Sequence, residues 1–201
     1  MKLYVTPMSP YARLARIMVI EKGLGDRVEV IQAKTRTAGS PYYQINPSGR
    51  VPYLVTDDGL GMEDSPLICA YLDSLDGKPR FHHPSRETDW AYRRVEASAR
   101  SLCDGITVWT REMARPESER SPTVLAHEVA RMERLADLFE TLVSDPLLQG
   151  APTMAHLILT VALDVARTRG PGSLTEAARS WPTGIAACPS CHRCERSLRF
   201  D

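Results

Sequence analysis

The chain has 201 residues, of which 43% are hydrophobic and 25% charged, a composition that predicts a folded protein with a sizeable core and excludes disordered and fibrous classes. Its 25 Lys and Arg balance 25 Asp and Glu, so no net charge draws it to nucleic acid or to an anionic membrane. No segment has the pattern of a signal peptide or of a membrane span, and the five cysteines are an odd number. We therefore expect a cytoplasmic protein with reduced thiols.

The first predicted elements are a strand, a tight loop and a helix. Leu3 to Thr6 is β-branched and aromatic, and Ser9-Pro10 then opens a helical pattern that can reach Lys22. Serine is a preferred N-cap and proline a preferred first helical residue, so the Ser9 hydroxyl should lie at a helix N-terminus, where it suits an anion. A purely capping Ser9 is the alternative.

Further strands and a helix complete this part of the chain. Residues 28–33 are almost continuously apolar, which predicts a buried parallel strand reached through the helix. After a polar segment with turn dipeptides at 46–49, strands at 51–56 and near Met62 flank a hairpin turn, and a helix runs from Asp64 to Gly77. The order predicts a mixed sheet with helices packed on it, closing as an α/β domain over residues 1–77.

The remainder of the chain carries only helical patterns. Apolar residues recur on one helical face within residues 87–115, 123–144 and 153–168. A polar connector at 78–86 precedes them. We therefore expect two domains, an α/β domain over 1–77 and an all-α domain over 87–201, joined by this linker.

Three motifs together resemble the cytosolic glutathione transferase family, specifically its bacterial serine-type members. They are the strand-loop-Ser9 helix start, the run GRVPYL at Gly49–Leu54 and the run DSPLICAYL at Asp64–Leu72, and their spacing makes the match specific over nearly the whole chain. The resemblance implies a thioredoxin-like N-terminal domain, an all-α C-terminal domain and a homodimer. It also implies glutathione as co-substrate, and a small hydrophobic electrophile as its reaction partner.

The first loop suits a thiol that a ligand supplies. Related redox proteins have two cysteines here, whereas this chain reads Ser9-Pro10-Tyr11-Ala12, which rules out disulfide exchange at this site. The resemblance implies that the Ser9 hydroxyl stabilises the glutathione thiolate, with Thr6 as the second choice.

The resemblance also implies how the rest of glutathione is bound. Asp64, where the family more often has Glu, would pair with the ammonium of the γ-glutamyl end, and Ser65 with adjacent N–H groups would receive its carboxylate. Val51 would pair its backbone with the cysteinyl amide, Pro52 would follow a cis bond, and Arg50 would contact the glycyl carboxylate. An ordinary helix cap at 64–66 and a solvated arginine are the alternatives.

The second domain is less informative. The resemblance implies that the electrophile pocket is lined by Tyr11, Cys103, Trp109 and Met113. For the last three, helical spacing instead favours packing in the core. His156 stands where the family usually has the Asp of a Ser/Thr-x-x-Asp capping box. Because a cation is unfavourable at a helix start, we expect a neutral His156 and a less well capped helix.

The spacing of Cys188, Cys191 and Cys194 matches both a zinc-binding site and a redox-active C-x-x-C pair. Pro189 suits the first residue of a last helix, on which Cys191 and Cys194 share an apolar stripe, and no second ligand pair is found to close a structural zinc site. We expect buried, inert thiols, Cys69 and Cys103 included, and no bound metal.

The predicted function is that of a glutathione transferase that activates the glutathione thiolate for attack on small hydrophobic electrophiles. Two alternatives stay open: a non-catalytic binding or docking module of the same fold, and a glutathione-dependent reductase or isomerase. The joint presence of Ser9, Arg50, Asp64 and Ser65 favours an enzyme, because a docking protein has no need of that hydroxyl and acid.

Overall fold

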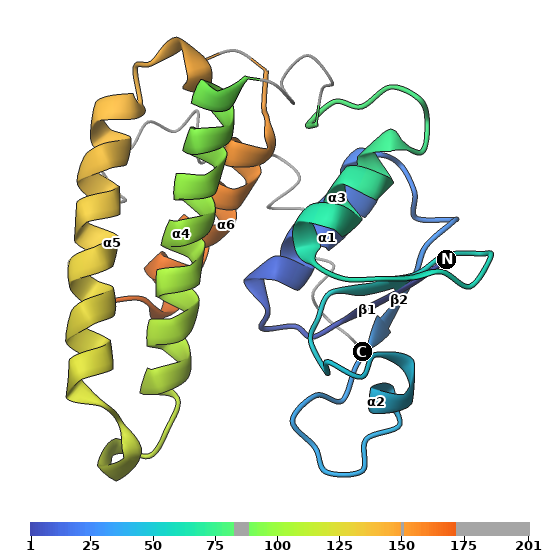
Figure 1. Ribbon diagram of the computed structural model, residues 1–201, viewed down its shortest axis with the longest axis horizontal. Helices are drawn as coiled ribbons and strands as arrows, with labels where there is room; N and C mark the ends of the chain where they lie inside the picture. The colour runs from blue at the N-terminus through green and yellow to red at the C-terminus, as the bar shows by residue number, and fades with distance from the viewer. Residues whose placement is uncertain (83–88, 150, 172–201) are drawn as a thin grey trace. The chain divides into compact units, whose positions relative to one another are not determined.

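The computed structural model describes residues 1–82, 89–149 and 151–171, which divide by their contacts into two units (Figure 1). The first unit comprises residues 1–82 and the second comprises the described residues from 89 onward. Cys188, Cys191 and Cys194 lie outside the described residues, so their expected burial stays a prediction.

The first unit is a mixed sheet with helices, and the predicted fold class is confirmed. Its strands form one sheet in the order β2-β1-β3-β4, in which β1 and β2 are parallel and the other neighbours antiparallel. This is the thioredoxin-like arrangement. The elements in chain order are β1 (Lys2–Val5), α1 (Pro10–Glu21), β2 (Glu29–Gln32), α2 (Tyr42–Ile45), β3 (Tyr53–Val55), β4 (Gly61–Met62) and α3 (Ser65–Ser74).

The core of the first unit lies between the sheet and the helices α1 and α3, which contact each other (Figure 1). Leu3 of β1 is fully buried and is paired with Leu54 of β3 and with Val30 of β2. The helices contribute fully buried side chains, among them Ile17 from α1 and Ile68 from α3. Each such side chain stabilises the fold by about 1.5–3 kcal/mol through burial.

The strand β2 and the end of α3 differ from expectation. β2 is parallel to β1 as predicted, but the expectation that it is buried is wrong. It lies at the sheet edge, where its first and last residues are exposed and the two between them are half-buried. The helix α3 ends at Ser74 rather than at Gly77. Gly77 instead adopts a φ of +68° in a turn that its N–H closes on the Ser74 carbonyl.

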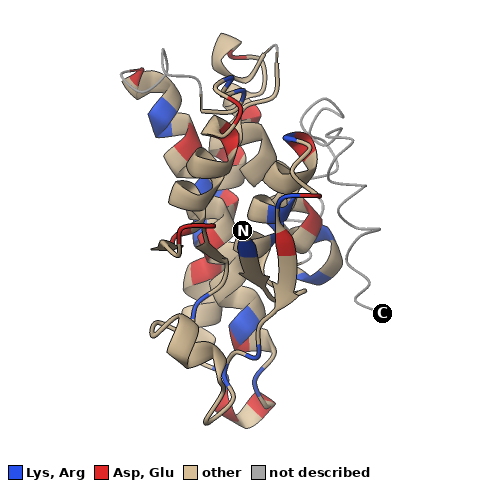
Figure 2. Cartoon of the chain, turned by 90° about the vertical axis from the view of Figure 1, so that its right-hand side faces the viewer, with Lys and Arg blue, Asp and Glu red and all other residues tan. Residues whose placement is uncertain are grey.

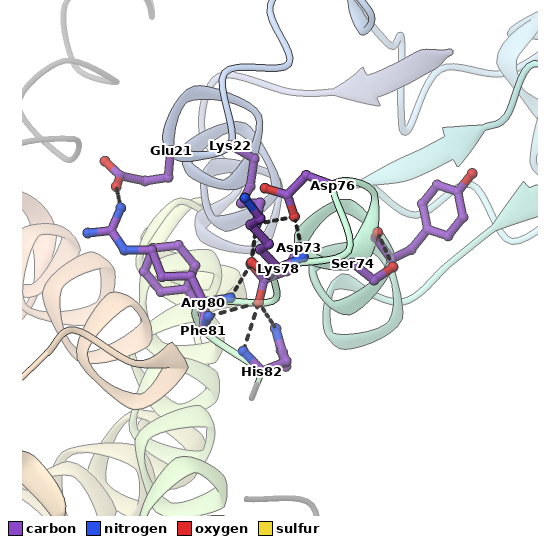
Figure 3. Close-up of polar contacts among 10 residues, drawn as sticks. Glu21, Lys22, Asp73, Ser74, Asp76, Lys78, Arg80, Phe81 and His82 are labelled. Atoms are coloured by element: carbon purple, nitrogen blue, oxygen red, sulfur yellow. Dashed lines mark hydrogen bonds and ion pairs between the residues drawn. The ribbon is translucent and has the colours of Figure 1, made fainter. Parts of the chain in front are cut away.

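Asp73, near the end of α3, holds the last described residues of the first unit (Figure 3). Its side chain is completely buried, and its carboxylate accepts hydrogen bonds from the backbone N–H groups of Arg80, Phe81 and His82 at 3.0, 2.8 and 2.8 Å. The ammonium of Lys22, at the end of α1, lies 3.3 Å away and also reaches Asp76 at 2.9 Å. One carboxylate therefore joins α1, α3 and the segment that leaves the unit.

The second unit is helical in the part that the structure describes. It contains α4 (Trp90–Met113), α5 (Pro122–Leu142), α6 (Met154–Arg169) and two short 3-10 helices at Glu117–Glu119 and Pro146–Leu148. The helix α4 packs against both α5 and α6 (Figure 1). Gly105 permits the close approach of α4 to α5, because a Cβ there would lie 3.1 Å from both Glu128 Oε2 and Met132 Cγ.

The start of α6 corrects one expectation. The N–H of Thr153 donates to His156 Nδ1 at 3.2 Å, and His156 Nε2 lies 3.2 Å from the Leu148 carbonyl. A ring nitrogen that accepts a hydrogen bond carries no proton, so this geometry describes a neutral imidazole. The expected weaker cap is wrong, because the histidine itself takes the acceptor role of the usual aspartate.

Charged side chains of both signs are distributed over the molecule. Figure 2 shows Lys and Arg interspersed with Asp and Glu along the described elements, in keeping with the zero net charge. Among the described helices, none combines the length and apolar character that a membrane crossing requires.

Candidate functional site

The N-terminus of α1 carries the predicted serine cap. Ser9 has extended backbone angles, its Oγ accepts a hydrogen bond from the Ala12 N–H at 3.2 Å, and Pro10 follows as the first helical residue. The Ser9 N–H in turn donates to the Thr6 carbonyl at 3.3 Å, which fixes the turn between β1 and α1. Within the described residues no protein acceptor is found for the Ser9 hydroxyl proton. The hydroxyl can thus cap the helix and still donate to a ligand.

The segment from Asn46 to Arg50 is held by its own polar groups. The Ser48 N–H donates to Asn46 Oδ1 at 3.1 Å, the Gly49 N–H to the Asn46 carbonyl at 3.0 Å, and the Arg50 N–H to Ser48 Oγ at 3.1 Å. The Arg50 carbonyl accepts from Asn46 Nδ2 at 3.0 Å and from the Tyr42 hydroxyl. This loop therefore has a defined shape without any ligand.

Val51 follows this loop and differs from it. The Val51–Pro52 peptide bond is cis, as the resemblance implied, and Val51 is half-buried. Among the described residues no hydrogen bond is found to the Val51 backbone N–H or C=O. A donor and an acceptor are thus left together just before the start of β3, in the form that an extended peptide can pair with. Arg50 is exposed next to them.

The start of α3 brings Asp64 and Ser65 together. Asp64 is the N-cap, and its Oδ1 accepts a hydrogen bond from the Ser65 N–H at 2.5 Å. This N–H was expected to bind a ligand carboxylate, but Asp64 already occupies it. The Ser65 side chain is 1% exposed, and its hydroxyl has no hydrogen-bond partner in the described structure. Buried hydroxyls are nearly always paired in folded proteins, so an unpaired one marks a functional candidate.

Glu63 is a site residue that the sequence did not reveal. One oxygen of its carboxylate, Oε2, accepts from Asn46 Nδ2 at 2.9 Å and from the Ser48 hydroxyl. The Ser48 hydroxyl and then the Asn46 amide hold the pKa of Glu63 below its ordinary value, and the charge of Arg50 acts in the same direction. Glu63 is therefore ionised at neutral pH. No sequence pattern indicates this link, because its partners are far apart in the chain and share no periodicity.

The buried Tyr42 holds the loop through its hydroxyl group. Burial raises the pKa of Tyr42, so its hydroxyl stays protonated and donates to the Arg50 carbonyl. Its ring lies 5.6 Å from the ring of Tyr4 on β1, measured between centroids. The loop is thus anchored to the sheet as well as to Glu63.

The residues nominated for the electrophile pocket lie in different units. Tyr11 is half-buried on α1, whereas Cys103, Trp109 and Met113 are on α4, where the last two are half-buried. Cys103 is 1% exposed, which matches the core-packing alternative, and burial followed by the nearby Asp104 carboxylate raises the pKa of its thiol to about 12. The pocket itself stays a prediction.

Within the described part of the chain, no three His, Cys, Asp or Glu side chains come together as a metal-binding group. The candidate site consists instead of hydroxyls, backbone groups and carboxylates at two helix starts and one loop. Its chemistry is that of binding a polar, peptide-like molecule.

Comparison with known proteins gives a consistent result for sequence and for fold. Residues 8–75 match the family described as Glutathione S-transferase, N-terminal domain. The uncharacterized GST-like protein YibF of Escherichia coli K12 is 32% identical over 140 residues, which cover 70% of this chain and 68% of that protein.

Solved structures resemble the chain over nearly its whole length. Gtt2 from Saccharomyces cerevisiae superposes with a TM-score of 0.77 at 22% identity, covering 96% of this chain and 100% of that one. A glutathione transferase family member from Pseudomonas fluorescens Pf-5, solved with bound glutathione, gives a TM-score of 0.79 at 22% identity, covering 96% and 97%. At these identities the structural likeness shows the fold alone.

Proposed function

Because this chain belongs to the glutathione S-transferase family, we propose that it binds glutathione and activates the glutathione thiol for attack on small hydrophobic electrophiles. The observation that carries the proposal is a set of polar groups in residues 1–82 for which the described part of the chain supplies no hydrogen-bond partner. The buried Ser65 hydroxyl and the backbone of Val51 are the main members of this set. The glutathione complex of the Pseudomonas fluorescens relative supports the same ligand.

Glutathione offers complementary groups for this set. Its γ-glutamyl end carries an ammonium, which Asp64 would bind, and a carboxylate, which the Ser65 hydroxyl would receive at the positive end of α3. Its cysteinyl amide would pair with the Val51 backbone as one more strand would. Arg50, exposed beside Val51, would contact the glycyl carboxylate.

Ser9 would supply the chemistry. A free thiol has a pKa of about 8.5, and lowering it by roughly two units requires about 2.7 kcal/mol of preference for the anion. A hydrogen bond to a charged group contributes roughly 1.5–3 kcal/mol and a helix N-terminus about 0.3–1 kcal/mol. The Ser9 hydroxyl at the start of α1 combines both contributions, with Thr6 as the alternative hydroxyl.

Isothermal titration with glutathione tests the binding proposal. We expect the wild-type protein to bind, and Asp64→Ala to weaken binding by about 1–3 kcal/mol because a charge-assisted contact is removed. Asp26→Ala, which removes an exposed carboxylate from the same unit, is the matched control and should leave the dissociation constant unchanged. Equal affinities of wild type and Asp64→Ala would contradict the assigned site.

A rate assay separates the enzyme from the docking alternative. Conjugation of glutathione to a generic aromatic electrophile would support the transferase. Glutathione binding without catalysis of any reaction of its thiol would favour a docking module. We also propose the homodimer that the resemblance implies and the cytoplasmic location expected from the cysteine usage and the missing signal-peptide pattern.

A further inference from the structure

The Glu63 carboxylate joins two segments that the proposed function uses separately. It comes directly before Asp64 and Ser65 at the start of α3, and it accepts hydrogen bonds from Asn46 and Ser48 in the loop that ends at Val51. Both bonds end on the same oxygen, Oε2. Asn46 is itself buried, at 3% exposure, so the loop end of this link lies in a fixed environment.

The partners of Glu63 also determine the position of Arg50. The Asn46 amide that donates to Glu63 donates to the Arg50 carbonyl as well, at 3.0 Å, and the Ser48 hydroxyl that donates to Glu63 accepts from the Arg50 N–H at 3.1 Å. Both backbone groups of the residue before Val51 are thus fixed by side chains that Glu63 holds. A shift of the carboxylate would be passed to Val51 through two parallel hydrogen-bonded paths.

We propose that Glu63 is a positioning residue that keeps the Val51 backbone and the Asp64–Ser65 helix start at the separation one glutathione molecule needs to contact both. This inference rests on the proposed function. A ligand that contacts two segments binds tightly only when both are held in place before it arrives, because otherwise it must order them itself. Glu63 supplies that order within the free protein.

The geometry distinguishes this role from a direct ligand contact. Oε2 already accepts two hydrogen bonds from the loop, so Glu63 serves the loop as a hydrogen-bond acceptor, and the Arg50 charge lies close enough to affect its carboxyl. A neutral acceptor of the same shape should therefore replace Glu63 in good part. A contact that depends on the charge would not be replaced in this way.

The test is titration of glutathione into wild type, Glu63→Ala, Glu63→Gln, Ser48→Ala and the double variant Glu63→Ala/Ser48→Ala, with the thermal midpoint of each. We expect Glu63→Ala to raise the dissociation constant about tenfold, and Glu63→Gln to stay within about threefold of wild type because its amide oxygen still accepts. Ser48→Ala should raise it several-fold, and the double variant should be no weaker than Glu63→Ala alone, since both changes break one link. Glu29→Gln, an exposed carboxylate on β2, is the control and should match wild type.

Each other outcome is decisive. A wild type that fails to bind glutathione would overturn the proposed function and this inference with it. If wild type binds and Glu63→Ala binds equally well, only the inference fails. It also fails if Glu63→Gln is as weak as Glu63→Ala while Ser48→Ala is unaffected, because that pattern belongs to a charge touching the ligand. A lowered midpoint in Glu63→Ala together with an unchanged dissociation constant would reduce Glu63 to a purely structural role.

Discussion

Replacing Asp73 by Asn should destabilise the first unit by about 1–3 kcal/mol or more. The carboxylate is completely buried and accepts from three backbone N–H groups while facing the Lys22 ammonium at 3.3 Å. An amide has one acceptor oxygen, so Asp73→Asn leaves at least one N–H unpaired and points an NH₂ group at donors. A buried N–H left unpaired costs about 1–3 kcal/mol. Losing the Asp73 charge beside the buried Lys22 ammonium adds to this cost, although Lys22 keeps Asp76 as a partner at 2.9 Å. This is a large part of the usual stability of a domain.

The same change should alter the response to acid. Burial by itself raises the pKa of Asp73, but hydrogen bonds from the backbone of Arg80, His82 and Phe81 and from Lys22 outweigh it and bring the pKa below its ordinary value. A group with a depressed folded pKa stabilises the fold above its unfolded pKa, about 3.9, and loses that contribution as the pH falls through the folded value. Wild type should therefore lose stability more steeply below about pH 4 than Asp73→Asn does.

Hydrogen exchange followed by mass spectrometry measures both effects in the intact chain. Peptides from α1 and α3 should exchange faster in Asp73→Asn, while peptides from α4 and α6 should change little. Asp76→Asn, an exposed carboxylate that contacts the same Lys22, is the matched control and should leave exchange nearly unchanged. Protection in α1 and α3 equal to that of wild type would refute the reasoning.

Three further changes test other features. Ser9→Ala should raise the pKa of the bound glutathione thiol by about one to two units and slow conjugation near neutral pH roughly 10- to 100-fold, with little loss of glutathione affinity. A pH–rate profile that shifts only in Thr6→Ala would instead assign thiolate stabilisation to Thr6. Gly105→Ala should lower the free energy of unfolding by up to about 2 kcal/mol, because overpacking of α4 on α5 costs about 1–3 kcal/mol and the better helix propensity of alanine returns about 1 kcal/mol. Gly25→Ala, with no atom near its added Cβ, should not lower it, and a Gly105→Ala denaturation midpoint above that of wild type would contradict this. His156→Ala should cost about 1 kcal/mol in urea unfolding, and an unchanged value would show that the α6 cap contributes nothing.

Local signals in the sequence were sufficient to predict where α1 and α3 begin. Ser9 and Asp64 precede proline-containing helix starts, and both are N-caps in the structure. The parallel pairing of β1 with β2 followed from the helix between them. The prediction that β2 is buried was wrong, because an apolar composition does not reveal which strand lies at the edge of the sheet.

Polar links between distant residues could not be predicted. Asn46 and Glu63 are 17 residues apart and belong to no periodic pattern, so only the folded chain brings them together. No sequence pattern indicates that Asp73 is buried, because its burial depends on the chain returning over it at residues 80–82. Similarly, His156 was expected to weaken a helix start, whereas its ring nitrogen supplies the missing acceptor.

The burial of Cys103 has a consequence if the protein acts on electrophiles as proposed. Because its pKa is raised to about 12, the Cys103 thiol stays protonated at neutral pH, whereas a few per cent of ordinary free thiols are ionised. Because the thiolate is the nucleophile, Cys103 reacts with electrophiles far more slowly than glutathione in solution does. Cys69 is fully buried on α3, where reagents reach it only when the fold opens. Under the proposed function, these two thiols escape self-inactivation by the very compounds that the protein would consume.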